Sequence, residues 1–293
     1  MNFRNILAEI EKTDPEVYER LSGRRHALKS FGSKVAVAAL PIALGSLLKK
    51  AYGKGTDATA IVNSLNFALE LEYFEYNFYH VANNTGGLIP ANDLPGFQTI
   101  EAHEMDHINF LKSTIISFGG TPYTPRNYNN PVSTNPAYVP SGTYDFTAGS
   151  TYHVFEDYNT FLIIAQTFED TGVRAYAGQL SVFLGSANST ILKQVLEISC
   201  VEARHAAHVR YVRRLRGGAA PDYPAPWITN NIPPVVALQA NYLGEDNVNQ
   251  DGIVITSLSG VSGTIPQASA TAAFDEPLDQ STVTNLIAPF FLP

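Results

Sequence analysis

The 293-residue sequence contains a single cysteine, Cys200. One thiol cannot form an intramolecular disulfide, and it cannot by itself hold a metal cluster that needs several thiolates. Cys200 falls within a strongly helical segment, where we expect a small core residue without a chemical role. Any chemistry in this chain must therefore come from other side chains.

The chain also has little positive charge. Lys and Arg number 19 against 27 Asp and Glu, which gives a formal net charge of -8. Nucleic-acid binding needs a basic face that neutralises phosphates, so we expect no nucleic-acid partner. The length is ample to bury a core, either as one domain with appendages or as two small domains.

Residues 1–50 have the composition of a targeting segment. Arg24-Arg25-His26-Ala27-Leu28-Lys29 precedes an apolar stretch from Phe31 to Leu48, and the two together resemble a twin-arginine export signal. We therefore predict a periplasmic or extracytoplasmic protein. An uncleaved membrane anchor and a buried or interfacial N-terminal helix are the alternatives, and membrane contact is expected only through this segment if it is not cleaved.

Four long segments have the periodicity and the stop signals of helices. They run from 56 to 83, from the turn at 90–95 to 118, from 157 to 184, and from 189 to 216. The connection at 122–156 is long for adjacent antiparallel helices, but it suits a crossover between parallel second and third helices. The sequence predicts an all-α, up-down-down-up four-helix bundle over residues 56–216.

Two of these segments carry a glutamate three residues before a histidine. The pairs are Glu104 with His107 and Glu202 with His205. On a helix this spacing places the carboxylate and the imidazole on one face, one turn apart, so both can bind one metal ion.

Each of the other two segments has a mid-helix glutamate among apolar or small neighbours, Glu72 in the first and Glu169 in the third. A buried carboxylate costs several kcal/mol unless it is paired or metal-bound. One Glu from each of two helices, with Glu-x-x-His from each of the others, is the ligand set of a dinuclear carboxylate bundle. The predicted metal ligands are Glu72, Glu104, His107, Glu169, Glu202 and His205.

A zinc hydrolase is the rival interpretation of the second segment. His103-Glu104-Met105-Asp106-His107 has the zinc-protease spacing, with two histidines as ligands and Glu104 as general base. This interpretation leaves Glu202 and His205 without a purpose, so we expect His103 to be a peripheral residue.

Several residues near the predicted ligands have no assigned role. Glu75 and Glu101 are candidates to orient a histidine N–H, although a surface role is equally expected for each. No catalytic residue is assigned, and no organic cofactor is predicted. The following aromatic residues are expected to serve mainly in packing: Tyr76, Tyr79 and Tyr176.

Residues 217–293 change to a composition rich in Pro, Gly, Asn, Ser and Thr. The segment has too little apolar periodicity for a core of its own, so we expect an irregular extension packed on the bundle. Within it, 252–258 resembles a strand and 281–288 a short helix.

Three phrases of the sequence resemble the ferritin-like superfamily, and in particular its desiccation-associated branch. They are Leu65–Tyr73, His103–His107 and Phe168–Tyr176, and Ala273–Leu278 with Ala288–Phe290 is similar to the same branch. The resemblance covers most of the chain after residue 56. It implies a ferritin-like bundle with a metal site, without fixing an activity.

Two imidazoles and four carboxylates form a hard, oxygen-rich donor set, which favours Fe or Mn over Zn or Cu. The expected cofactor is two Fe ions or two Mn ions, or one of each. The corresponding reaction class is an oxidoreductase that oxidises Fe(II) or acts on dioxygen or peroxide. A non-catalytic stress or envelope protein is the alternative, and a homo-oligomer remains open.

Overall fold

The computed structural model describes residues 58–125, 143–184, 189–217, 225–260 and 263–292. Gly55–Pro293 forms one compact unit. The expected export or anchor segment, residues 1–50, lies outside the described residues. Among the described helices, none is both long and apolar enough to cross a membrane.

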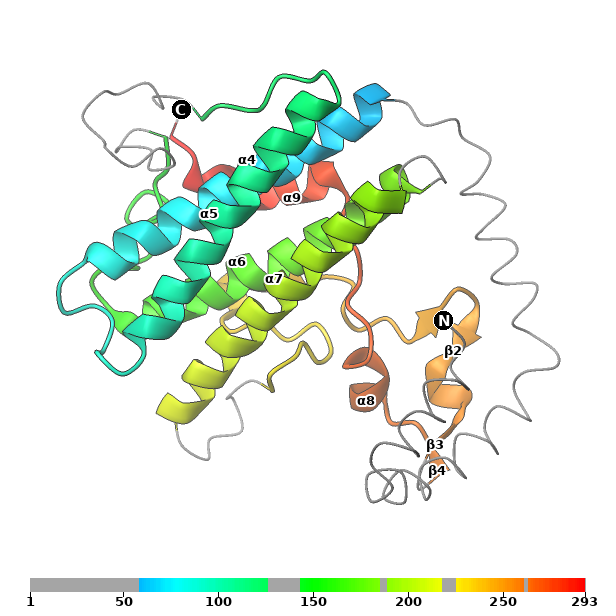
Figure 1. The fold of residues 1–293 in the computed structure, drawn as a ribbon. Helices are drawn as coiled ribbons and strands as arrows, with labels where there is room; N and C mark the ends of the chain where they lie inside the picture. Colours follow the sequence, from blue (N-terminus) through cyan, green and yellow to red (C-terminus); the bar gives the residue numbers. More distant parts are fainter. Residues whose placement is uncertain (1–57, 126–142, 185–188, 218–224, 261–262, 293) are drawn as a thin grey trace, which may run out of the picture. The chain divides into compact units, whose positions relative to one another are not determined.

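The bundle consists of two antiparallel helix pairs (Figure 1). Its helices are α4 (Ala58–Asn84), α5 (Leu94–Ser117), α6 (Tyr158–Gln179) and α7 (Ser189–Arg216). Helix α4 packs along α5, and α6 along α7, while contacts between α4 and α6 and between α5 and α7 join the pairs. Helices α5 and α6 run in the same direction, so the chain crosses over between them. The predicted all-α bundle is confirmed.

Local signals set the ends of these helices. The Asp157 side chain caps α6 by accepting a hydrogen bond of 2.7 Å from the Thr160 N–H. Helix α5 has Pro95 in its first turn, where the missing N–H costs nothing. It ends before Gly119, whose φ of 75° is left-handed. After α6, a 3₁₀ turn, η1 (Leu180–Phe183), completes the predicted third helix.

Helices α4 and α6 are buried on all sides over their middle turns. Every residue from 71 to 79 and from 164 to 176 is buried. A single inward stripe, which the sequence pattern predicts, would leave the opposite side of each helix exposed. On α6 the difference arises because α9 (Gln280–Ile287) and η3 (Val236–Tyr242) of the C-terminal extension pack on it. On α4, rings of the crossover and of the C-terminal end, Phe146 and Phe290, pack on Phe74.

An aromatic cluster joins the bundle to the crossover and to the C-terminal end. The Phe74 ring of α4 lies 4.7 Å from Phe168 of α6 and 5.1 Å from Phe146 of the crossover, measured between centroids. Phe290 lies 5.0 Å from Phe168. The backbone continues this contact, since the Asp145 N–H donates to the Phe290 carbonyl at 2.8 Å. These edge-to-face and tilted ring contacts hold α4 against α6, the crossover and the C-terminal end.

The C-terminal extension is irregular, as predicted, but its strand is shorter than expected. Its elements are η3 (Val236–Tyr242), β1 (Asn249–Gln250), β2 (Ile253–Val254), η4 (Ile255–Ser257), β3 (Ser259–Gly260), β4 (Gly263–Thr264), α8 (Gln267–Thr271), α9 (Gln280–Ile287) and η5 (Ala288–Phe290). The single strand predicted over 252–258 is wrong. Asp251 and Gly252 have φ of 50° and 88° and form a two-residue hairpin turn between β1 and β2, and η4 then ends the pairing.

Cys200 is exposed on the outer side of α7, so the core position predicted for it is wrong. Glu202, two residues later, is fully buried, and a two-residue step on a helix turns the side chain to a different face.

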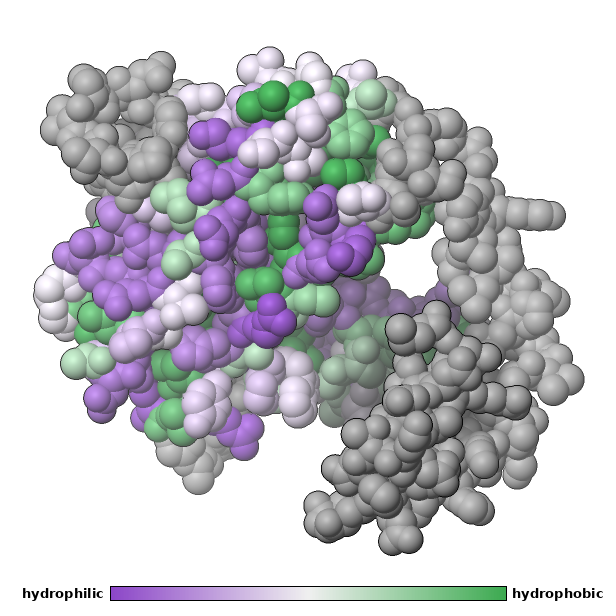
Figure 2. Space-filling model, viewed as in Figure 1, coloured by the Kyte–Doolittle hydropathy of each residue, from purple (hydrophilic) through white to green (hydrophobic). Residues whose placement is uncertain are grey.

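Figure 2 shows hydrophilic residues over much of the visible face, with hydrophobic ones between them.

Arg174 of α6 fastens the extension to the bundle. Its guanidinium is 2.7 Å from the Glu245 carboxylate, and the two side chains are 1% and 0% exposed. It also donates to the backbone carbonyls of Glu276 at 2.7 Å, Asn241 at 2.5 Å and Leu243 at 2.7 Å. Burial raises the pKa of Glu245 to about 7 although Arg174 opposes this rise, so the carboxylate depends on its cation.

We expect Arg174→Met to lower the free energy of unfolding by about 3–5 kcal/mol, because it leaves the buried Glu245 carboxylate without its cation and with the Glu276 N–H as its remaining donor. Denaturant unfolding followed by circular dichroism measures the change. Lys193→Met, which removes an exposed pair with Glu197, is the control and should stay within about 0.5 kcal/mol of the parent. Equal midpoints for the two variants would show that Arg174 does not anchor the extension.

Candidate metal centre

The structure brings all six predicted ligands together in the middle of the bundle. They form two groups in which the donor atoms lie within 4.8 Å of one another: Glu72, Glu104, His107 and Glu202 in the first, and Glu104, Glu169, Glu202 and His205 in the second. Each of the four helices contributes. The cluster lies at mid-helix, where the four helices face one another.

Glu104 and Glu202 belong to both groups, and each offers a different oxygen to each histidine. His107 Nδ1 is 3.1 Å from Glu104 Oε2 and 3.2 Å from Glu202 Oε1. His205 Nδ1 is 2.9 Å from Glu104 Oε1 and 3.7 Å from Glu202 Oε2. This arrangement suits two bridging carboxylates between two neighbouring ions.

Glu72 and Glu169 belong to one group each. Glu72 Oε2 lies 3.1 Å from His107 Nδ1, and Glu169 Oε2 lies 3.6 Å from His205 Nδ1. Each would therefore serve a single ion. The sequence spacing predicts the membership of the site but not this division between shared and unshared carboxylates.

Several donor atoms of the cluster have no hydrogen-bond partner within the protein and are therefore suited to bind cations. Both oxygens of Glu202, Oε1 of Glu104, Oε2 of Glu169 and Nδ1 of His205 are buried without a hydrogen-bond partner. Leaving such atoms unpaired costs about 1–3 kcal/mol each, and more where the group is charged. Two divalent ions would balance four carboxylates and use these free lone pairs.

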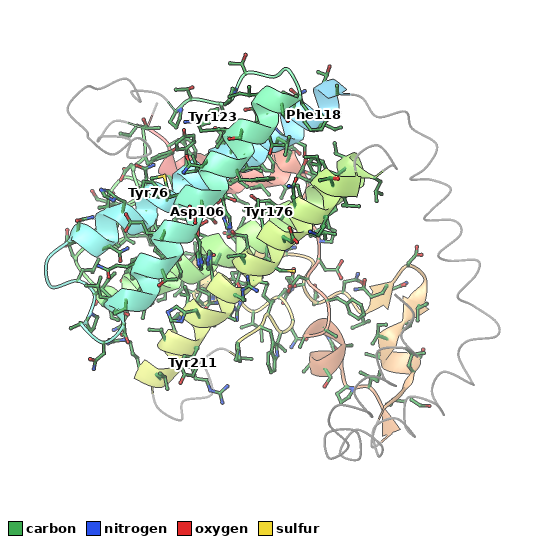
Figure 3. All side chains as sticks on the ribbon, viewed as in Figure 1. Tyr76, Asp106, Phe118, Tyr123, Tyr176 and Tyr211 are labelled. Atoms are coloured by element: carbon green, nitrogen blue, oxygen red, sulfur yellow. The ribbon has the colours of Figure 1, made fainter. Side chains whose placement is uncertain are left out.

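Two tyrosines hold the unshared carboxylates in place. The Tyr79 hydroxyl of α4 donates to Glu169 Oε1 at 2.5 Å, and the Tyr176 hydroxyl of α6 donates to Glu72 Oε1. Tyr176 is labelled in Figure 3. In each carboxylate the other oxygen, Oε2, stays directed at the site. Packing alone is therefore too small a role for these tyrosines, and their position seven residues after each glutamate could have revealed it.

His103 supports His205 from outside the cluster. Its Nδ1 is 3.0 Å from His205 Nε2, and the two rings stack with centroids 5.3 Å apart. His103 is therefore peripheral, as predicted, and it belongs to neither donor group. A hydrogen bond to the outer nitrogen of a ligand histidine fixes the orientation of the ring.

Glu101, which the sequence analysis considered as a group that could orient a ligand histidine, has other partners. Its carboxylate accepts hydrogen bonds from His80 and Asn83, each at 2.7 Å, and so it orients no ligand histidine.

His208, one turn past His205, lies against the Phe97 ring at 5.7 Å, and its buried Nε2 has no hydrogen-bond partner.

When no metal is bound, the surroundings of the site favour the protonated forms of His107, His205 and Glu104. Although burial disfavours their charged forms, the facing carboxylates raise the pKa of both His107 and His205 far above the ordinary value. Burial and the charge of Glu202 raise the pKa of Glu104. Burial opposes the ionisation of Glu202, but the two imidazoles, whose Nδ1 atoms lie 3.2 Å and 3.7 Å from its oxygens, lower its pKa to about 2.

A surface hollow of about 270 Å³ between α5 and α7 reaches His107, one of the predicted ligands. Its other lining residues are Phe110, Gln194, Glu197, Ile198 and Val201. A water molecule takes about 30 Å³ in the liquid, so the hollow admits several small molecules. It offers a path from solvent to the histidine side of the cluster.

The family comparison agrees with this geometry. The family model described as the ferritin-like domain matches residues 60–214, more than half of the chain. The chain belongs to the ferritin-like family. The match spans nearly all of α4 to α7 and includes all six cluster residues of this ferritin-like chain. Among curated proteins, none matches it.

Metal binding should release protons, and the affinity should increase as the pH rises. The histidine and Glu104 pKa values are raised, so these groups carry protons at neutral pH that a metal ion must displace. Titration with Mn(II) at several values between about pH 6 and 8, with a pH indicator in weak buffer, measures both effects. Binding that releases no protons and is equally tight across this range would contradict the assignment.

Proposed function

We propose that this ferritin-like protein binds two Fe or two Mn ions, or one of each, and acts as an oxidoreductase on Fe(II), dioxygen or peroxide. The observation that carries the proposal is the pair of overlapping donor groups sharing Glu104 and Glu202. Shared carboxylates hold two ions close together, which is the arrangement that two-electron chemistry on a small molecule needs.

The donor set supports Fe or Mn as the metals. Four carboxylates and two imidazoles provide hard donors, and the lone Cys200 is exposed and outside the cluster. When bound, such ions would supply electrons through the change between their divalent and trivalent states. The chain holds the donors in place through Tyr79 and Tyr176 and leaves the His107 side reachable through the hollow.

We expect Glu104→Ala or Glu202→Ala to abolish the binding of two ions, since each removes a donor from both groups. The purified chain and its variants would be loaded anaerobically with Fe(II) or Mn(II). Metal content is then measured by elemental analysis, and Fe(II) oxidation and peroxide breakdown by absorbance. Glu101→Ala is the matched control because its carboxylate lies on the same helix but bonds His80, so it should keep both ions.

The outcome separates the proposal from its alternatives. Two bound ions without turnover would favour a non-catalytic stress or envelope protein, which the resemblance to the desiccation-associated branch also allows. One zinc ion with peptide cleavage would favour the hydrolase. Trace metal after loading in the parent chain would refute the metal centre itself.

We propose further that the protein is exported in folded form. The support is in the sequence alone, where Arg24-Arg25 precedes the apolar stretch from Phe31 to Leu48. Replacing both arginines with lysine should move the protein from the extracytoplasmic to the cytoplasmic fraction of a bacterium that has the twin-arginine pathway. Unchanged fractionation of the Lys-Lys variant would refute this route.

A further inference from the structure

Glu75 is a buried carboxylate that the six-residue set does not use. It lies on α4 one turn after Glu72 and is 4% exposed. Among the described residues, its carboxylate takes part in no hydrogen bond and no ion pair. The histidine-orienting role considered in the sequence therefore does not apply. A buried carboxylate without a partner costs several kcal/mol, so its position calls for a cation.

The side of Glu75 that faces away from the cluster offers no such partner. A small cavity there is lined by apolar side chains, among them Leu71, Phe74 and Phe168. Its polar members have other partners, since the Thr171 hydroxyl donates to the Thr167 carbonyl at 2.7 Å and Asn241 donates to Thr171 at 3.0 Å. Compensation for the charge must come from the metal side.

Gly172 of α6 makes room for this carboxylate next to the cluster. A Cβ at Gly172 would lie 2.9 Å from Glu75 Oε1 and 3.8 Å from Glu202 Oε2, so both carboxylates approach the same point. Any residue larger than glycine would have to displace Glu75. A glycine inside a helix costs about 1 kcal/mol relative to alanine, and here it leaves the space that Glu75 occupies.

The charges around Glu75 have the same sign. Burial, followed by the charges of Glu202, Glu169, Glu104 and Glu72, raises the pKa of Glu75 well above the ordinary value. All four predicted carboxylate ligands are therefore near enough to act on it. Cations bound among them would reverse this repulsion.

We propose that Glu75 is a seventh ligand, which binds the metal pair from the side where α4 faces α6. This inference rests on the proposed dinuclear centre. Four carboxylates balance two divalent ions, so a fifth adds negative charge that favours the trivalent state. Glu75 therefore sets the reduction potential of the pair as well as its affinity.

The test compares the full-length parent with Glu75→Gln, which keeps the shape and removes the charge. We expect the variant to bind the two ions at least about tenfold more weakly, and its reduction potential to rise because an anionic ligand is lost. Gly172→Ala should shift both quantities in the same direction by displacing the carboxylate. Glu101→Gln is the control and should leave both unchanged.

A crystal structure of the parent loaded with Mn(II) or Fe(II), with anomalous data, decides the point independently of how the variants fold. A Glu75 oxygen bonded to a metal ion is the expected result. Two bound ions with Glu75 outside their coordination shells, or unchanged affinity and potential in Glu75→Gln, would overturn this inference and leave the proposed function standing. A parent that binds no metal would overturn both.

Discussion

The repulsion among four carboxylates buried at one point is the constraint on which this structure depends. Glu72, Glu104, Glu169 and Glu202 are each 0% exposed, and in the part of the chain that the structure describes their ion pairs are with His107 and His205, not with arginine or lysine. Folding such a cluster without compensation would cost far more than the few kcal/mol by which proteins are stable. In the metal-free chain, protons on His107, His205 and Glu104 relieve part of this charge. Metal ions can take over that role, which couples the stability of the bundle to its loading.

The surrounding cations are committed elsewhere, which keeps the centre acidic. Asp170 follows Glu169 directly but points away from the cluster, where it pairs with Arg210 at 2.5 Å and accepts a hydrogen bond from Tyr242 at 2.6 Å. Arg174, on the same helix, pairs with Glu245 of the extension. Helix α6 therefore presents its charges in two directions, one toward the cluster and one toward the C-terminal extension. The extension both covers the helix and supplies counterparts for charges that could otherwise compete with a metal.

Sequence spacing predicts the bundle and the membership of the site because both depend on helical periodicity. Glu104 with His107 and Glu202 with His205 can be identified without coordinates, and the long connection indicates the crossover. The spacing does not distinguish shared from unshared carboxylates, because that depends on how four helices approach one another. The sequence pattern also wrongly predicts a core position for Cys200. It predicts too long a strand at 252–258, where local turns end the pairing. The roles of Tyr79 and Tyr176 were detectable, since each follows a glutamate by seven residues, but a core aromatic has the same spacing.

Helices α4 and α6, which carry the unshared carboxylates, have matching residues at the same spacing, except at one position. In α4 the order is Glu72, Glu75 and Tyr79, and in α6 it is Glu169, Gly172 and Tyr176, with the same intervals of three and four residues. Each tyrosine reaches across to the glutamate of the other helix. A side chain at the third-residue position of both helices would occupy the same space, because a Cβ at Gly172 already lies 2.9 Å from Glu75 Oε1. Close packing therefore permits one extra carboxylate and not two, and glycine on α6 is the condition for glutamate on α4.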